Sequence, residues 1–172
     1  MNGGGRVAAV ATRCVRWQVS FQLRLDTVLV GHLPLDAPIC VEPESSVRSV
    51  LSALVRQRGD SVLVCRANRM LGIFTERDAL RMMAMAADLE VAISQAMTSS
   101  PAKLSKHDSL ATAIQTMSRG GYRRLPVVDE ALVPLGVLKT SHILHYLAEH
   151  FPKIIYNLPP APHHAARVRE GA

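Results

Sequence analysis

A hydroxyl and a carboxylate stand three residues apart in the segment Gly72-Ile73-Phe74-Thr75-Glu76-Arg77-Asp78. The apolar residues before Thr75 favour a strand and the residues after it favour a helix, so Thr75 falls at a helix start. The first N–H groups of a helix lack backbone partners and favour an anion such as phosphate. Asp78, one turn along the same face, could accept both hydroxyls of a ribose. The same spacing also fits a capping box, in which Thr75 and Asp78 satisfy each other's backbone.

This motif lies inside an internal repeat, and the two copies are 63 to 64 residues apart. Gly72, which lets a ligand or another backbone segment come close, is matched by Gly136 within the repeated pieces Leu71-Gly72-Ile73-Phe74 and Leu135-Gly136-Val137-Leu138. Two apolar stripes keep the same register; the matched sets are Val47, Val50, Leu51, Leu54 with Leu110, Ala113, Ile114, Met117, and Ala79, Leu80, Met83, Ala84 with Ile143, Leu144, Leu147, Ala148. A repeat of this kind determines the architecture.

Each copy is expected to contain a strand, a helix, two strands and a second helix. In the first copy the patterns predict strands over 38–41, 61–65 and 70–74, a helix from 47 capped by Ser46, and a helix from 75 to about 86. In the second copy they predict strands over 102–104, 124–128 and 133–138, with helices ending at 118 and spanning 141–150. The predicted fold class is α/β (α+β), with two pseudo-symmetric β-α-β-β-α repeats packed as one module.

The predicted organisation has four parts. Residues 1–33 form a partly disordered N-terminal extension, in which 15–25 alternate as in a half-buried strand. Residues 34–92 are the first repeat and 93–152 the second. Residues 153–172 form a flexible proline-rich tail.

The repeat resembles a tandem pair of CBS domains, the family named after cystathionine β-synthase. The resemblance is carried by the segment from Gly72 to Asp78, by Gly121-Tyr122-Arg123-Arg124-Leu125-Pro126-Val127-Val128-Asp129 and by Leu135-Gly136-Val137-Leu138. It implies two halves packed through their sheets, frequent flat dimers, and clefts that bind AMP, ADP, ATP or S-adenosylmethionine. It also implies a regulatory module that senses energy charge and is not an enzyme.

Carried over by position, the resemblance implies that Asp78 binds the ribose hydroxyls and Thr75 a phosphate or ribose oxygen. Arg77 would lie near the phosphates. The adenine would be flanked by a set of residues from two strands, namely Ile39, Cys40, Val41, Val62 and Val64.

The second half departs from this pattern, because Lys139 stands at the position of Thr75 and His142 at that of Asp78. A ribose there would lose its carboxylate acceptor. Lys139, Arg123 and Arg124, beside Pro126, could still attract phosphate, or they could form a solvated basic face. We therefore expect one competent site at the first motif and a degenerate or anion-only second site.

The composition limits the partners, compartments and cofactors that fit the chain. The net charge of +6 comes from the chain ends, since residues 36–150 carry 13 Lys and Arg against 12 Asp and Glu, and aromatics are scarce. Nucleic acid is therefore an unlikely partner. The three cysteines, Cys14, Cys40 and Cys65, form no CxxC pair and favour a reducing, cytoplasmic compartment. No apolar run is long enough for a membrane span, and no metal or other cofactor is expected.

The leading hypothesis is a regulatory module that binds an adenosine-containing ligand between the repeats and signals to a protein effector, as a homodimer. The alternative is a ligand-free structural module for dimerisation and protein interaction. The Thr75/Asp78 pair favours the first hypothesis, and the altered Lys139/His142 pair favours the second.

Overall fold

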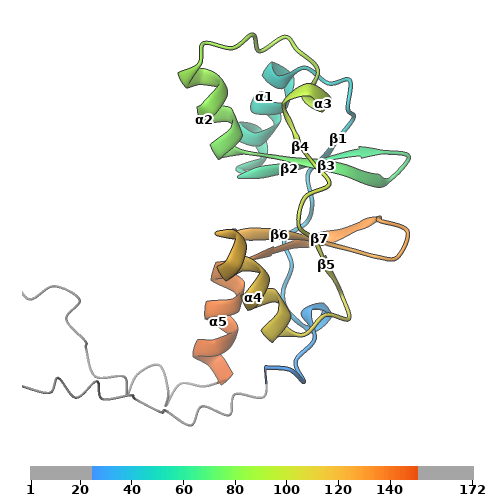
Figure 1. Cartoon of the computed structure of the whole chain (residues 1–172), viewed down its shortest axis with the longest axis vertical. Helices are drawn as coiled ribbons and strands as arrows, with labels where there is room; N and C mark the ends of the chain where they lie inside the picture. Colours follow the sequence, from blue (N-terminus) through green and yellow to red (C-terminus); the bar gives the residue numbers. More distant parts are fainter. Residues whose placement is uncertain (1–24, 151–172) are drawn as a thin grey trace, which may run out of the picture.

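Two small sheets face each other at the centre of the molecule, and the helices cover their outer sides (Figure 1). The structure is a computed structural model that describes residues 25–150. The first sheet has four strands in the order β1-β2-β3-β4, and the second has three in the order β5-β6-β7. This mixed α+β architecture with two pseudo-symmetric halves confirms the predicted fold class.

The first half contains β1 (Cys40–Val41), α1 (Val47–Gln57), β2 (Ser61–Arg66), β3 (Arg69–Thr75), α2 (Glu76–Ala84), the short helix α3 (Ile93–Ala96) and β4 (Thr98–Ser99). β1 runs parallel to β2, whereas β2, β3 and β4 are antiparallel to one another. The predicted strands and helices are present to within a few residues. The sequence patterns did not predict α3 and β4.

The second half contains the 3-10 helix η1 (Val30–His32), β5 (Leu104–Ser105), α4 (Leu110–Gly120), β6 (Arg124–Val128), β7 (Pro134–Lys139) and α5 (Thr140–His150). The pairing repeats that of the first half, because β5 is parallel to β6 and β6 is antiparallel to β7. Helix α4 runs two residues further than predicted, and Gly121 ends it in the left-handed region at φ +64°.

The helix starts follow from capping serines. Ser46 accepts the N–H of Ser49 at the start of α1, and Ser109 accepts the N–H of Thr112 at the start of α4. Each of these hydrogen bonds satisfies one of the N–H groups that a helix start leaves open. The two serines are 63 residues apart, so the repeat extends to the caps.

The two sheets pack on each other through a small apolar cluster. Its buried members are Leu63, Cys65, Met70, Ile73, Val128 and Val137. On the opposite faces of the sheets, two larger cores lie beneath the helices. Alternate strand residues therefore face either the helices of their own half or the other half, as period-two strands require.

Each core is completed by the segment that precedes the other half. Val30 and Leu33, which come before the first half, are buried in the core of the second. Ile93, which comes before the second half, is buried in the core of the first. The hydrogen bonds correspond at a shift of 63, since Ile93 N–H donates to Ser45 O and Val30 N–H donates to Asp108 O.

This packing includes the described end of the predicted N-terminal extension, 1–33. In the described part of that segment, residues 25–33 pack on the second half. The alternating pattern over 15–24 and the tail from 153 lie outside the described residues.

The two matched glycines make room for the crossing segments. A Cβ on Gly72 would lie 2.5 Å from Met97 Sδ and 2.8 Å from Thr98 O, and one on Gly136 would lie 2.7 Å from Leu35 Cβ. Gly72 was expected to let either a ligand or another backbone segment come close, and the structure shows a backbone segment there.

Candidate functional site

The first motif lies where β3 ends and α2 begins, as predicted. Asp78 Oδ2 accepts the backbone N–H of Thr75 at 3.0 Å and the Thr75 hydroxyl at 2.7 Å. The local cap is therefore formed. The other carboxylate oxygen, Oδ1, has no hydrogen-bond partner among residues 25–150, and the Asp78 side chain is half-buried. Asp78 thus holds the helix start with one oxygen, and its second oxygen is left without a protein partner in the described part of the chain.

The other residues predicted for the first site divide into two groups. Ile39, Cys40 and Val41 lie on or beside β1, with Cys40 exposed and its neighbours half-buried. Arg77 is exposed on the first turn of α2. Cys40 and Arg77 are therefore exposed, whereas Ile39 and Val41 pack partly against the core beneath the helices.

Val62 and Val64 require a correction. Both side chains are completely buried in the core between the first sheet and its helices. The β2 residues that face the other half are Leu63 and Cys65. The sequence pattern predicted the correct strand but the wrong set of residues facing the other half. Both faces of β2 are buried, so no polar residue distinguishes one face from the other.

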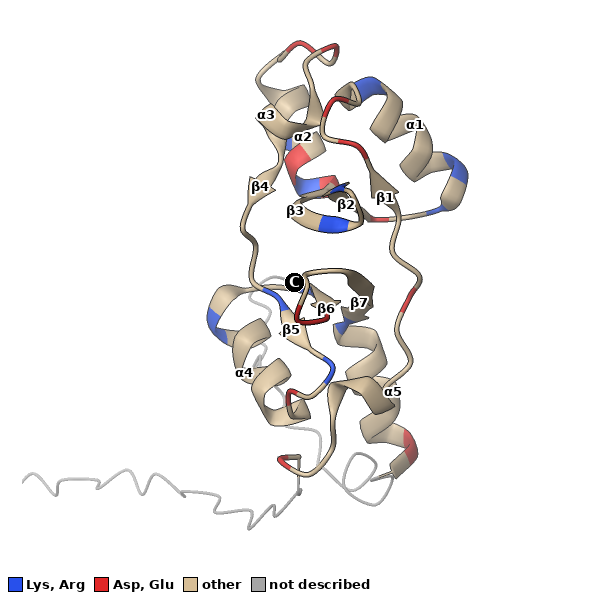
Figure 2. Ribbon diagram, turned by 90° about the vertical axis from the view of Figure 1, so that its right-hand side faces the viewer, with Lys and Arg blue, Asp and Glu red and all other residues tan. Residues whose placement is uncertain are grey.

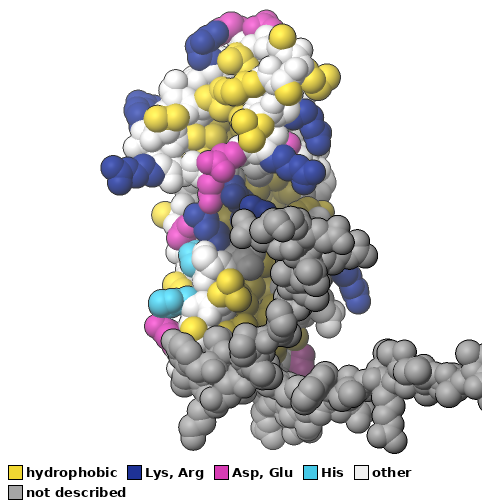
Figure 3. All heavy atoms as spheres, turned by 90° about the vertical axis from the view of Figure 1, so that its left-hand side faces the viewer, with side chains coloured by type: hydrophobic (Ala, Val, Ile, Leu, Met, Phe, Trp, Pro, Cys, Tyr) yellow, Lys and Arg dark blue, Asp and Glu magenta, His cyan; other side chains and the backbone are white. Residues whose placement is uncertain are grey.

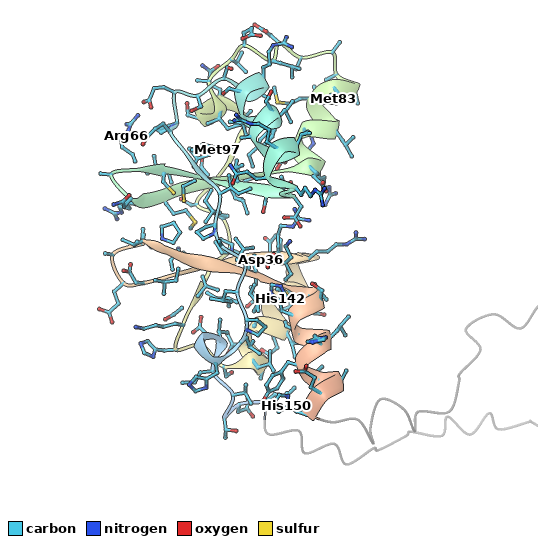
Figure 4. The ribbon with its side chains drawn as sticks, turned by 180° about the vertical axis from the view of Figure 1, so that it is seen from behind. Asp36, Arg66, Met83, Met97, His142 and His150 are labelled. Carbon is cyan, nitrogen blue, oxygen red and sulfur yellow. The ribbon has the colours of Figure 1, made fainter. Side chains whose placement is uncertain are left out.

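The second motif reproduces the backbone geometry of the first with different side chains. Lys139 N–H donates to His142 Nδ1 at 3.3 Å, which is the bond that Thr75 N–H makes to Asp78. The other ring nitrogen of His142, Nε2, lies 3.3 Å from Asp36 Oδ1. His142 therefore caps the helix in place of an aspartate and binds a carboxylate on its other side (Figure 4).

Lys139 is held by two carboxylates from outside its own half. Its Nζ lies 2.7 Å from Asp36 Oδ2 and 3.0 Å from Asp60 Oδ2. The Lys139 side chain is 29% exposed, and those of Asp36 and Asp60 are 45% and 28% exposed. These ion pairs are therefore partly shielded from water.

Asp60 also connects the two motifs. Its carboxylate lies 3.2 Å from Arg124 Nη1, and its backbone carbonyl accepts a hydrogen bond from the same guanidinium. That carbonyl also accepts the N–H of Glu76 at 3.2 Å, at the start of α2. One residue thus touches the helix start of the first motif and two cations of the second.

We name the group of Asp36, Asp60, Arg124, Lys139 and His142 the ionic cluster. Figure 3 shows acidic and basic side chains grouped where the two halves meet. In contrast, Figure 2 shows charged residues of both signs scattered over the outer parts of both halves. Close opposite charges lower the pKa of the Asp36 carboxyl, chiefly through its hydrogen bond with Lys139, and raise the pKa of Lys139, chiefly through the same bond.

A hollow of about 290 Å³ adjoins this cluster. It is lined by Asp60 from the first half and by Arg123, Arg124, Lys139, Thr140 and Ser141 from the second. Arg123 is exposed, and its guanidinium has no partner among the described residues. The predicted basic residues Arg123, Arg124 and Lys139 are thus brought together, whereas Pro126 is buried further along β6.

Two acidic members of the ionic cluster, Asp36 and Asp60, were not predicted from the sequence. Asp36 lies before the first predicted strand, on a segment joined to β7 by backbone hydrogen bonds with Val137 at 3.0 and 3.1 Å. The shift of 63 would have matched Asp36 with Ser99 and Asp60 with Arg123. The counterparts of these two acidic residues are therefore a serine and an arginine, so the repeat does not conserve the two carboxylates.

The family model for the CBS domain matches residues 30–85 and 92–149, which together make up most of the chain. The chain belongs to the CBS domain family. CBS domain pairs are generally regulatory modules.

Curated relatives match the same region. Over 105 residues, 60% of this chain, it is 33% identical to arabinose 5-phosphate isomerase KdsD of Francisella tularensis, and spans only 32% of that protein. Over 108 residues it is 28% identical to the CBS domain-containing protein YhcV of Bacillus subtilis, covering 60% of this chain and 77% of that one. The chain thus spans about a third of the isomerase and most of the second relative.

Solved CBS domain structures share the fold. A CBS domain protein from Pyrobaculum aerophilum complexed with AMP aligns with a TM-score of 0.64 at 24% identity, over 71% of this chain and 99% of that one. A CBS domain pair in complex with 5′-methylthioadenosine and S-adenosyl-L-methionine aligns with a TM-score of 0.64 at 18% identity, over 71% of this chain and 97% of that one. The whole of each neighbour therefore corresponds to the two halves described above.

Two further observations concern residues 25–150. No helix there is both long and apolar enough to cross a membrane. No group of three or more His, Cys, Asp or Glu side chains in that range is arranged to hold a metal ion.

Proposed function

We propose that this CBS domain pair is a regulatory module that binds one adenosine-containing ligand, such as AMP, ADP, ATP or S-adenosylmethionine, at the first motif. The observation that carries the proposal is the half-buried Asp78 carboxylate, whose Oδ1 is open while Oδ2 fixes the helix start. An ionised carboxylate oxygen is a strong acceptor for a ribose hydroxyl. The AMP and S-adenosylmethionine complexes of the structural neighbours support the choice of ligand class.

The surroundings of Asp78 support a nucleoside more than a bare anion. Thr75 and Ser61 pair across β2 and β3, and their hydroxyls donate to the carboxylates of Asp78 and Asp60, so acidic groups lie beside the motif. Arg77 and Arg123 are the exposed cations available to a phosphate that extends from the sugar. Ile39 to Val41 on the edge strand remain the proposed contacts for the adenine.

Regulation would follow from a shift in population. A ligand between the halves stabilises the arrangement of the two sheets to which it binds better, and a protein effector reads that arrangement. The module would sense the supply of adenosyl ligand without catalysing a reaction. We place it in the cytoplasm, where the thiols of Cys40 and Cys65 stay reduced.

The test is isothermal titration calorimetry with AMP, ATP and S-adenosylmethionine. We expect one site per chain in the wild type and a loss of affinity of at least about tenfold in Asp78→Ala, since one charged hydrogen bond is removed. Asp108→Ala is the matched control, because Asp108 Oδ2 accepts the N–H of Ser105 at 2.8 Å in a similar local cap away from the motif. Equal affinity in the wild type and Asp78→Ala would contradict the proposal.

A ligand-free structural module is the second candidate, and a specific observation favours it. Asp78 already caps α2, so the motif is explained locally even without a ligand. If Asp78→Ala and Asp108→Ala lower the melting temperature alike, and no adenosyl ligand changes it in the wild type, this candidate is preferred.

A homodimer belongs to both candidates. Leu80 and Met83 on α2 are 67% and 54% exposed, and Leu144, the counterpart of Leu80 on α5, is 59% exposed. Apolar side chains repeated at matched positions on outer helices suit a contact between copies. Light scattering should give twice the mass of the chain for the wild type and half that value for Leu80→Lys/Leu144→Lys.

A further inference from the structure

The positions that correspond to the first site's polar groups are already filled in the second. At the first motif, Asp78 Oδ2 accepts the N–H and the hydroxyl of Thr75, and Asp78 Oδ1 has no hydrogen-bond partner among residues 25–150. At the second, the matching Lys139 and His142 are both bonded to the carboxylate of Asp36, through Oδ2 at 2.7 Å and Oδ1 at 3.3 Å. The Asp36 carboxylate therefore binds both functional side chains of the second motif, Lys139 and His142.

We propose that the second cleft is locked by its own chain: Asp36 acts as an internal anionic ligand of Lys139 and His142, and an external polyanion enters only by displacing it. This inference concerns how the module is regulated. It rests on the proposed function in one respect, namely that the two motifs are equivalent ligand positions. The lock makes ligand binding unequal between the two clefts. It would explain why one motif keeps the ribose-binding residue types and the other does not.

Asp36 is the carboxylate that yields first. Its side chain is the most exposed of the cluster at 45%, whereas Asp60 is 28% exposed and is also bonded to Arg124 and to the Ser61 hydroxyl. The Asp36 backbone is fixed to Val137, so only a rotation of the side chain is needed to release Lys139. Asp60 would remain as the anchor between the halves.

The negative charge of Asp36 determines which class of anion can displace it. A monoanion exchanges one negative group for another and gains little. A polyanion such as a di- or triphosphate can also contact the free guanidinium of Arg123 and the hydroxyl of Ser141, which line the hollow. The lock should therefore favour polyphosphate groups over a single phosphate.

The experiment titrates inorganic pyrophosphate, then inorganic phosphate, into the full chain by calorimetry at low ionic strength. We expect Asp36→Asn to bind pyrophosphate about tenfold more tightly than the wild type, the change expected for removal of one competing charged contact. Asp36→Ser, which installs the residue type found at Ser99, should do the same and guards against misfolding of one variant. Asp88→Asn changes the net charge equally, lies outside the cluster, and should bind as the wild type does.

A second step locates the binding. Adding Lys139→Met to Asp36→Asn should abolish the gain in pyrophosphate affinity. If Asp36→Asn and Asp36→Ser, folded as judged by circular dichroism, bind pyrophosphate no better than the wild type, the lock is refuted. An equal gain in Asp88→Asn would refute it as well, because the effect would then be one of net charge.

These outcomes are independent of the adenosyl proposal. Pyrophosphate binding that depends on Asp36, with no AMP binding in any variant, would retain the lock and overturn the ligand. AMP binding that depends on Asp78, with pyrophosphate binding unaffected at Asp36, would retain the ligand and overturn the lock.

Discussion

Replacing Gly72 by alanine should destabilise the fold without removing any group that a ligand could use. The added Cβ would lie 2.5 Å from Met97 Sδ and 2.8 Å from the Thr98 carbonyl oxygen. The sulfur belongs to a flexible side chain and can move. The carbonyl belongs to β4, where Thr98 pairs with Ile73 and Ser99 pairs with Gly72, so it can move only by distorting the edge of the sheet.

The expected cost combines two opposing effects. Overpacking of a well-packed site costs about 1–3 kcal/mol. An alanine in a strand recovers about 0.5–1 kcal/mol relative to glycine, because it restricts the unfolded chain. The net loss in the free energy of unfolding should therefore be about 1–2 kcal/mol, which corresponds to a decrease of about 5 °C in melting temperature.

The assay is urea unfolding followed by circular dichroism, with two comparisons. Gly121→Ala meets no atom within 4 Å but must adopt φ +64°, so its loss of about 1 kcal/mol measures backbone strain alone. Combining Gly72→Ala with Met97→Ala should fail to restore stability, because the clash with Thr98 O remains. A Gly72→Ala protein as stable as the wild type would refute the view that β4 lies directly against this glycine.

Three further predictions concern titration and capping. The Asp36 pKa is lowered and that of Lys139 is raised, so their contribution to stability should be lost as the pH falls below the ordinary carboxyl value of 3.8 and as it rises above the ordinary lysine value of 10.5; urea unfolding across this range measures both limits. Burial raises the pKa of the Cys65 thiol to about 12, so iodoacetamide at pH 8 should modify exposed Cys40 first, as mass spectrometry would show, and an equal rate for Cys65 would contradict its burial. Ser46→Ala removes the cap of α1 and should cost about 1 kcal/mol, measured by urea unfolding.

Much of the fold could be predicted because the repeat doubles every local signal. The strand over 124–128 has the predicted ends, and the capping role of Ser46 is confirmed. In contrast, α3 and β4 have four and two residues, too short for a periodic pattern to develop. Their order depends on packing against the first half, which local sequence does not encode.

The contacts of the candidate site could be predicted only where the residues are close in the sequence. Thr75 and Asp78 are three residues apart and meet on one helical turn, so their contact follows from spacing. The ionic cluster joins Asp36, Asp60 and Lys139 across more than 75 residues of chain. Such contacts depend on how the halves dock, and that arrangement came from the structure.

The crossing of η1 and α3 bears on what a single copy could do. The repeated unit begins near residue 28 and again near residue 91, yet the first residues of each copy fill the core of the other. This is an intramolecular domain swap. An isolated copy spanning 28–90 would expose the hollow left by Ile93, and it could close that hollow only by exchanging its leading segment with an identical chain. The tandem arrangement makes that exchange concentration-independent, because linkage supplies the partner within the same polypeptide.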